Sequence, residues 1–295
     1  MRPRPDVVTL GSVPPRLRRR LLRLALGLVF VAVALAVYGL GIEPGRLRVV
    51  ETSLPLPSWP ASHAGLRVAV LTDLHVGAPH IDLARLAQVV DETNAAQPDV
   101  IVVLGDLLID GVAGGHFVEP EPIAEQLGRL RADVVVAVLG NHDWWFDGPR
   151  TIAALEHAGL VVLENRAQAF ESDGRRLWIA GISDAWTRGA DVDAALAGID
   201  DGAPVLAITH NPDVFPQVPQ RVALTLAGHT HGGQIDVPLL GPPVVPSRFG
   251  QRYAAGHVIE DGRHLFVGTG VGTSIIPVRI AVVPRIDVLA LSGAP

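Results

Sequence analysis

Residues 67–106 read RVAVLTDLHVGAPHIDLARLAQVVDETNAAQPDVIVVLGD. Two apolar runs in this stretch, at 67–73 and 99–106, have the length and the Val and Ile content of buried strands. Between them, residues 82–96 repeat apolar residues at helical spacing, and Asp82 is placed to cap the N-terminus of that helix. Buried strands separated by a helix indicate a layered α/β fold.

The same alternation continues along the chain. Further strands are expected at 133–143, 177–184, 204–210 and 222–231, and further helices at 119–131, 149–159 and near 191–199. After residue 250 the pattern becomes all β, with expected strands at 251–260, 264–270, 280–283 and 286–291. These extra segments predict a second sheet packed on the first.

Composition narrows the classes of function. The chain has 295 residues, 48% of them hydrophobic, no cysteine, and arginine as its only strongly basic residue type. Without cysteine or lysine, the chain has no disulfides, thiolate zinc sites, iron–sulfur clusters, cysteine nucleophiles or phosphate-loop lysines. Residues 43–295 carry 29 acidic residues against 17 arginines. An acidic body of this kind is not expected to bind nucleic acid, and it suits bound cations.

Residues 24–42, LALGLVFVAVALAVYGLGI, form an uncharged run of 19 residues. As a helix this run spans roughly 28 Å, close to the apolar thickness of a bilayer. A buried core helix is the alternative, but such helices usually keep a polar stripe. Arginines crowd the preceding residues, so the positive-inside rule puts the N-terminus in the cytoplasm and the main domain outside. These arginines are Arg16, Arg18, Arg19, Arg20 and Arg23.

The expected organisation therefore has four parts. They are a basic segment at 1–23, a transmembrane helix at 24–42, a Pro-rich and largely extended linker at 43–65, and the main domain at 66–295. The segment 18–23 loosely resembles a twin-arginine export signal. Because the small-residue cleavage candidate lies inside the apolar run, we expect an uncleaved single-pass anchor in the cell membrane.

Polar clusters follow five of the expected strands. They read TDLH (72–75), LGD (104–106), LGNHDWW (139–145), THNPD (209–213) and LAGHTHGGQ (226–234). Ligands in layered α/β folds bind at the carboxyl ends of strands, so these clusters are expected to meet there. Taken singly, an Asp or His of this set is equally typical of a helix cap or a turn, whereas GNHD and GHTHGGQ rarely arise by chance.

The available ligand types predict a transition-metal site. Carboxylate and imidazole groups without sulfur suit Mn, Fe, Zn or Co, whereas Ca²⁺ and Mg²⁺ prefer oxygen ligands. Two such ions about 3.5–4 Å apart need a bridging carboxylate and a bridging hydroxide. We therefore expect two divalent transition-metal ions as cofactors.

These motifs resemble those of the calcineurin-like metallophosphoesterases, in particular the membrane-anchored bacterial branch of YaeI/YkuE-like phosphodiesterases. The resemblance covers about residues 66–291, and the anchor with Ile42-Glu43-Pro44 matches the branch as well. It implies two β-sheets sandwiched between helices, with a dinuclear site that hydrolyses phosphodiester or pyrophosphate bonds. A non-catalytic metal-binding or sensor protein on the same fold is the alternative, which His142 disfavours because holding metal does not require it.

The resemblance also implies a role for each motif residue. Its metal ligands are Asp73, His75 and His231 for the first ion, Asp106 between the two ions, and Asn141, His210 and His229 for the second. His142 is implied as the acid or charge stabiliser beside the leaving oxygen, and Asp143 as the residue that orients it.

Two further residues are candidates for substrate contact. His116 lies in a Gly-rich loop, which alternatively only turns the chain, and Trp144 follows the GNHD motif but is also suited to core packing. A phosphorylated small molecule or a lipid-linked phosphate is the expected substrate. No motif specifies an oligomeric state.

Overall fold

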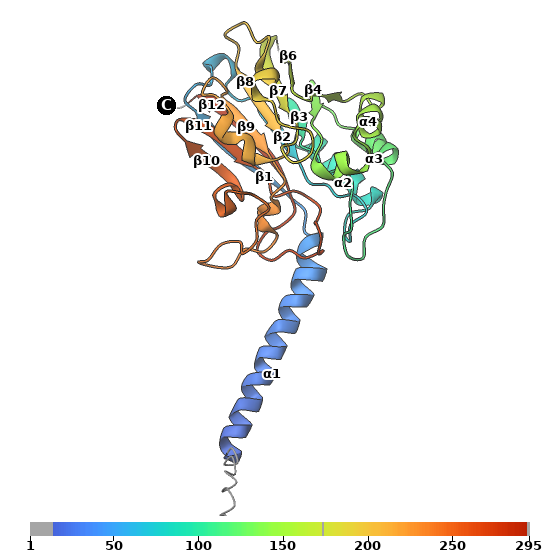
Figure 1. The fold of residues 1–295 in the computed structure, drawn as a ribbon, viewed down its shortest axis with the longest axis vertical. Coiled ribbons are helices and arrows are strands. Elements are labelled where there is room, and N and C mark those ends of the chain that lie inside the picture. Colours follow the sequence, from blue (N-terminus) through green and yellow to red (C-terminus); the bar gives the residue numbers. More distant parts are fainter. Residues whose placement is uncertain (1–13, 173, 294–295) are drawn as a thin grey trace, which may run out of the picture.

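The computed structural model describes residues 14–172 and 174–293, and it contains two six-stranded sheets (Figure 1). The first sheet has the order β1-β12-β2-β3-β4-β5, and the second has the order β10-β11-β9-β8-β7-β6. Both sheets are mixed. The strands are β1 Arg48–Leu56, β2 Arg67–Leu71, β3 Val100–Val103, β4 Val134–Ala137, β5 Val161–Val162, β6 Arg166–Ser172, β7 Arg175–Ile182, β8 Val205–Thr209, β9 Leu224–Ala227, β10 Gly256–Glu260, β11 Arg263–Val267 and β12 Arg285–Gly293.

Helices cover the outer faces of both sheets. A buried apolar layer that includes Val70, Val102, Ile208 and Leu226 fills the space between the sheets. The outer face of the first sheet packs on α2, α3 and α4, and that of the second sheet packs on α5. The four-layer arrangement expected from the sequence is confirmed. The helices are α1 Pro15–Val37, α2 Leu83–Ala95, α3 Pro120–Leu127, α4 Asn141–His157 and α5 Val192–Leu196.

The segment expected as a linker at 43–65 is extended, but much of it belongs to the first sheet. Strand β1 pairs in parallel with β12 along its whole length, from Arg48 opposite Arg285 to Leu56 opposite Gly293. Leu54 and Leu56 are buried in the layer between the sheets, so burial of their apolar side chains stabilises the pairing of this strand. The segment therefore forms an edge strand of the domain.

Three other expectations need correction. Of the strand expected at 251–260 only Gly256–Glu260 forms, because Gly250–Tyr253 is a 3-10 helix. Residues 280–283 do not form a strand: Ile280 makes one isolated parallel bridge to Ile235, and Ala281 has a φ of 59°, a left-handed conformation that interrupts extended backbone. Helix α4 begins at Asn141, well before the expected start at residue 149, and a non-helical Asp147 kinks it. The GNHD motif is therefore the first turn of a helix.

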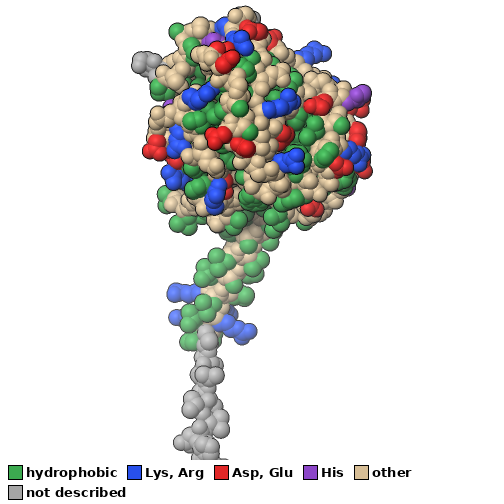
Figure 2. Space-filling model, turned by 45° about the horizontal axis from the view of Figure 1, so that its top comes forward, with side chains coloured by type: hydrophobic (Ala, Val, Ile, Leu, Met, Phe, Trp, Pro, Cys, Tyr) green, Lys and Arg blue, Asp and Glu red, His purple; other side chains and the backbone are tan. Residues whose placement is uncertain are grey.

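The N-terminal helix projects from the domain (Figure 1). Helix α1 continues through one π-helical turn at Tyr38–Ile42, and among the described residues it is the one helix long and apolar enough to cross a membrane. None of the side chains of α1 is buried, and Figure 2 shows hydrophobic side chains along the visible face of the helix, with arginines near its start. Residues 1–13 of the expected basic segment lie outside the described residues.

Candidate metal centre

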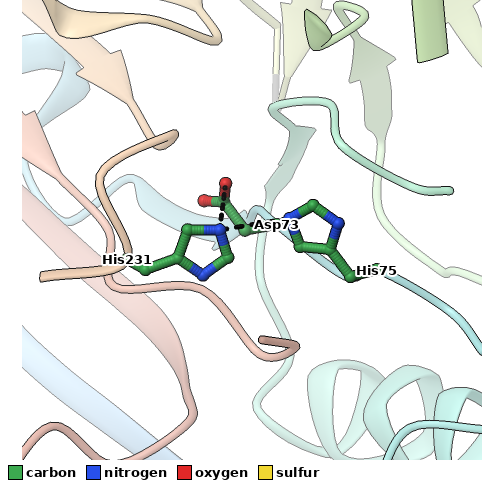
Figure 3. A group of neighbouring side chains, drawn as sticks. All are labelled: Asp73, His75 and His231. Atoms are coloured by element: carbon green, nitrogen blue, oxygen red, sulfur yellow. Dashed lines mark hydrogen bonds and ion pairs between the residues drawn. The ribbon is translucent and has the colours of Figure 1, made fainter. Parts of the chain in front are cut away.

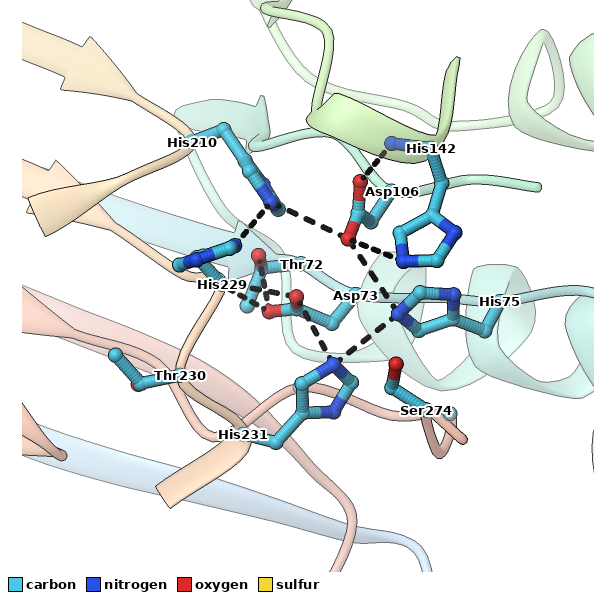
Figure 4. A network of polar contacts seen from close by, with 12 residues as sticks. Thr72, Asp73, His75, Asp106, His142, His210, His229, Thr230, His231 and Ser274 are labelled. Carbon is cyan, nitrogen blue, oxygen red and sulfur yellow. Dashed lines mark hydrogen bonds and ion pairs between the residues drawn. The ribbon is translucent and has the colours of Figure 1, made fainter. Parts of the chain in front are cut away.

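The expected ligands converge from both sheets onto one site, and Figure 4 labels all of them except Asn141. Each follows the carboxyl end of a strand: β2, β3 and β4 in the first sheet, and β8 and β9 in the second. Because the two sheets face each other, these ends meet in the same region. The residues expected as ligands are Asp73, His75, Asp106, Asn141, His210, His229 and His231, and all are buried.

Asp73, His75 and His231 form the first group of convergent atoms (Figure 3). Nε2 of His231 lies 3.3 Å from Oδ1 of Asp73 and 3.1 Å from Nε2 of His75. The Asp73 carboxylate is fixed from behind by the hydroxyl of Thr72 at 2.7 Å and by the backbone N–H of His229 at 3.0 Å. This group offers one carboxylate oxygen and two imidazole nitrogens to a single point.

A second group consists of Asp106, His210 and His229. Nδ1 of His229 lies 3.1 Å from Nε2 of His210, which is itself 3.3 Å from Oδ2 of Asp106. Oδ1 of Asn141 is buried and has no hydrogen-bond partner among the described residues. A buried amide oxygen without a donor needs an explanation, and a cation supplies one.

Asp106 touches both groups. Its Oδ2 lies 3.5 Å from Nε2 of His75 and 3.3 Å from Nε2 of His210. Its Oδ1 accepts the backbone N–H of His142 at 2.9 Å, so the carboxylate is held with Oδ2 toward the imidazoles.

Backbone carbonyls select the tautomers of two histidines. Nδ1 of His75 donates to the carbonyl oxygen of Leu108 at 3.0 Å, and Nδ1 of His210 donates to that of Leu104 at 2.7 Å. In the neutral rings this leaves the Nε2 lone pairs pointing into the site. Carbonyl-oriented imidazoles of this kind are typical of metal ligands.

The buried charges also favour a cation here. Burial raises the pKa of Asp73 to about 6 and that of Asp143 to about 7, while it lowers the pKa of His75 to about 4. Burial alone disfavours a charged His210, yet the charges of Asp106 and Asp73 outweigh it and raise the pKa of His210 to about 10. The carboxylates thus draw a positive charge into a buried site. Since orphaned oxygen, oriented lone pairs and excess negative charge coincide, the residues fit divalent metal ions.

Most ligands occupy left-handed backbone conformations. The φ angles lie between 43° and 70°. Side chains other than Gly, Asn and Asp seldom adopt this region, and such strain clusters at functional sites. The residues are Asp73, His75, Asp106, His229 and His231.

Two glycines allow the ligand loops to approach each other. A Cβ atom on Gly140 would lie 2.2 Å from Oδ1 of Asp106, and one on Gly228 would lie 1.8 Å from the hydroxyl oxygen of Thr72. Glycine is therefore required at both positions for steric reasons.

His142 lies at the edge of the centre. Its Nε2 is 3.9 Å from Oδ2 of Asp106, and its ring packs edge-on against those of His75 and Trp145. Its Nδ1 is buried and has no hydrogen-bond partner within the described ranges. The side chain also lines the pocket over the centre.

The structure places Asp143 differently from the expectation that it orients His142. Its Oδ1 accepts the backbone N–H groups of Leu107 and Leu108 at 2.9 and 3.2 Å, and its Oδ2 accepts that of Gly140 at 2.9 Å. All of its described hydrogen bonds go to the backbone because the carboxylate points back beneath the loop that carries Asp106. Asp143 therefore ties that loop to the start of α4.

A pocket of about 350 Å³ opens over the centre. Two exposed tryptophans line it: Trp145 packs against His142, and Trp186 packs edge-on against His229 with ring centroids 4.3 Å apart. Apolar side chains of Val244 and Ile275 complete its rim. Trp186 was not predicted as a site residue because no motif surrounds it. Its position shortly after the carboxyl end of β7 could have indicated that it lies near the site.

The two expected substrate residues lie outside this pocket. Trp144 packs against the apolar core on the helical side of the first sheet, because its ring is wedged beside Gly148. His116 lines a separate depression near Pro79 and His80, where its backbone is held by Gly77. Contact of either residue with substrate stays a prediction, and Trp145 is the tryptophan of this motif that lines the pocket over the centre.

Comparison with known proteins gives consistent matches. The sequence model of the calcineurin-like phosphoesterase family matches residues 66–233. A transmembrane protein with metallophosphoesterase domain from Danio rerio is 32% identical to this chain. The match covers 91% of this chain and 62% of that protein's length. The metallophosphoesterase YkuE of Bacillus subtilis is 27% identical, and the match covers 87% of this chain and 89% of YkuE. The phosphodiesterase YaeI of Escherichia coli is 28% identical, and the match covers 84% of this chain and 90% of YaeI.

Among solved structures, the calcineurin-like phosphoesterase YfkN of Bacillus subtilis covers 70% of this chain and 82% of its own, with a TM-score of 0.43 and 14% identity.

Proposed function

The chain belongs to the calcineurin-like phosphoesterase family, and from this premise we propose that it is a two-metal hydrolase of phosphodiester or pyrophosphate bonds. Family membership makes it a metal-dependent phosphoesterase. The number of ions, the bond cleaved and the roles of individual residues are the proposal.

The position of Asp106 carries the proposal. One of its oxygens faces Nε2 of His75 and Nε2 of His210, which belong to different ligand groups. A carboxylate shared in this way suits two neighbouring ions. We assign Asp73, His75 and His231 to one ion and Asn141, His210 and His229 to the other. Mn, Fe, Zn and Co all suit these ligands.

When bound, the ions lower the pKa of water and stabilise negative charge on the phosphoryl oxygens. In the hydrolysis, one water gives a proton to solvent and its oxygen forms a new bond to phosphorus, while the bond from phosphorus to the leaving oxygen breaks. His142, beside the centre and facing the pocket, donates a proton to that leaving oxygen and then regains one from solvent. Asp143 keeps the Asp106 loop in place during this step.

The substrate is a phosphorylated small molecule or a lipid-linked phosphate. The name of the YaeI relative, a phosphodiesterase, supports a diester. Helix α1 is proposed to anchor the chain in the membrane across residues 24–42, with the domain outside the cytoplasm. Because β1 belongs to the first sheet, we place the start of the catalytic domain near residue 43 instead of 66.

Metal-dependent turnover tests the function. The full chain, purified in detergent, is stripped with a chelator and resupplied with Mn²⁺, Zn²⁺, Co²⁺ or Fe²⁺, and its activity is measured on bis-p-nitrophenyl phosphate, a phosphomonoester and a nucleoside-diphosphate sugar. We expect the stripped protein to be inactive and at least one ion to restore diester or pyrophosphate cleavage. Turnover of the monoester alone, or activity indifferent to chelation, would contradict the proposal.

A further inference from the structure

Two uncharged loops lie beside the junction between α1 and the domain. Residues 237–247, VPLLGPPVVPS, and residues 269–278, TGVGTSIIPV, contain no charged side chain. Large apolar side chains at their tips point into solvent, with Leu239 fully exposed, Val244 72% exposed and Ile275 71% exposed. Contiguous exposed apolar surface of this kind marks an interaction site.

The loops are joined to each other. The side-chain amide of Gln234 donates to the carbonyl oxygen of Ser274 at 3.1 Å and accepts the backbone N–H of Ser274 at 2.8 Å. The adjoining Gly233 sits against Pro242 of the other loop, where a Cβ atom would come within 2.4 Å. The two apolar tips therefore belong to one surface.

Backbone strain adds a second observation. Ile275 has a φ of 63° and Leu239 a φ of 71°, both in the left-handed region. For a β-branched residue this conformation is an outlier that the surrounding structure must hold in place. The carbonyl oxygen of Ile275 accepts the backbone N–H of Ala113, which fixes the strained turn with its side chain outward.

The position of this surface relative to α1 identifies its occupant. The backbone N–H of Arg279 donates to the carbonyl oxygen of Gly39 at 2.9 Å, and Gly39 packs closely on Ile280. Gly39 lies inside the uncharged run 24–42 and also lies against Val278, the last residue of loop 269–278, so this loop lies level with the end of the apolar helix. Figure 1 shows both loops at the end of the domain from which α1 departs.

We propose that the tips of loops 237–247 and 269–278 enter the surface of the same bilayer that α1 crosses. The proposal rests on the proposed membrane anchor, because the surface is continuous with that helix. Apolar side chains favour the interface through the area they bury, without needing a partner protein. Val244 and Ile275 also line the pocket over the metal centre, so this seating opens the pocket at the level of the lipid headgroups.

The absence of native cysteine allows single-site labelling. Leu239→Cys and Ile275→Cys variants of the full chain carry an environment-sensitive NBD fluorophore, in vesicles of phosphatidylcholine and phosphatidylglycerol with and without a nitroxide-labelled lipid. Phe30→Cys in α1 is the positive control. Ile259→Cys, an exposed isoleucine on β10, is the matched negative control.

We expect blue-shifted emission and strong nitroxide quenching at positions 239, 275 and 30, and neither effect at 259. Quenching at 30 with water-like emission at 239 and 275 would contradict the insertion of the loop tips into the bilayer, while the membrane anchor would still be supported. Blue-shifted but unquenched emission at 239 and 275 would indicate a covering protein or a second copy, and would also overturn it. No quenching at 30 would contradict the membrane anchor, and the proposed insertion of the loop tips, which depends on that anchor, would be contradicted as well. None of these readouts depends on turnover.

Discussion

Asp106 and His142 are linked through the backbone: the N–H of His142 donates to Oδ1 of Asp106 at 2.9 Å. The same bond fixes the carboxylate that faces both ligand groups and places the His142 side chain, as the second residue of α4, at the edge of the centre. In the proposed mechanism this hydrogen bond joins the carboxylate between the two metal groups to the proton donor, and single substitutions at Asp106 and His142 separate the two roles.

Replacing His142 by alanine should leave the metals bound and slow the chemical step. General acid catalysis contributes typically about 10²–10⁴-fold, and least where the leaving group needs no proton. We expect a large fall in kcat with a poor alcohol leaving group and a small fall with p-nitrophenolate. Kinetics over a series of leaving groups, with elemental analysis of each preparation, measure this. Equal losses across the series would contradict proton donation by His142, and loss of metal would indicate that His142 is a ligand.

Replacing Asp143 by alanine should destabilise the fold. Three buried backbone N–H groups, those of Leu107, Leu108 and Gly140, would lose their acceptor. Each unsatisfied donor costs about 1–3 kcal/mol, so the free energy of unfolding should fall by about 3 kcal/mol or more. Thermal or denaturant unfolding measures the change. A variant with native stability and impaired turnover alone would instead support the orienting role implied by the family resemblance.

Replacing Gly140 by alanine should weaken metal binding. The new Cβ would lie 2.2 Å from Oδ1 and 2.5 Å from the backbone nitrogen of Asp106, and this contact must displace the carboxylate. We expect a loss of metal affinity of at least about tenfold, the usual scale for a disturbed ligand support. Gly202→Ala is the matched control, because no atom lies within 4 Å of its added Cβ. Similar metal affinities for the two variants would refute the steric argument.

The topology of the anchor is tested by reporter fusions after residue 295. Arginines before residue 24 favour a cytoplasmic N-terminus. An alkaline-phosphatase fusion should therefore be active, and a fusion to a fluorescent protein that matures only in the cytoplasm should be dark. The reverse pattern would place the catalytic domain in the cytoplasm.

The sequence indicates the candidate site because the residues expected as ligands follow strands. Asp73, Asp106 and His210 each come after a short apolar run, and parallel strands in facing sheets bring such ends together. The helix expected at 82–96 is confirmed as α2, and its predicted N-cap Asp82 accepts the backbone N–H of Arg85. Local patterns of this kind survive in the fold because burial and capping act within a few residues.

Contacts between residues far apart in the sequence could not be predicted from these local patterns. The pairing of β1 with β12 joins residues more than two hundred positions apart, so the Pro-rich stretch gave no sign of it. The left-handed conformations of His75 and His231 are imposed by the site and not by residue preference. Trp144 and Trp145 are adjacent and chemically identical, so the sequence does not show which of them faces the pocket; the structure places Trp145 there.

Metal stoichiometry tests the central claim, a centre of two ions joined by Asp106, most directly. Elemental analysis of the full chain, reconstituted and freed of loose metal, should give close to two transition-metal ions per chain. Asp106→Asn should retain at most one, because the amide removes the negative charge that both groups share. One ion in the unaltered chain, or two in the Asp106→Asn variant with full activity, would contradict the account.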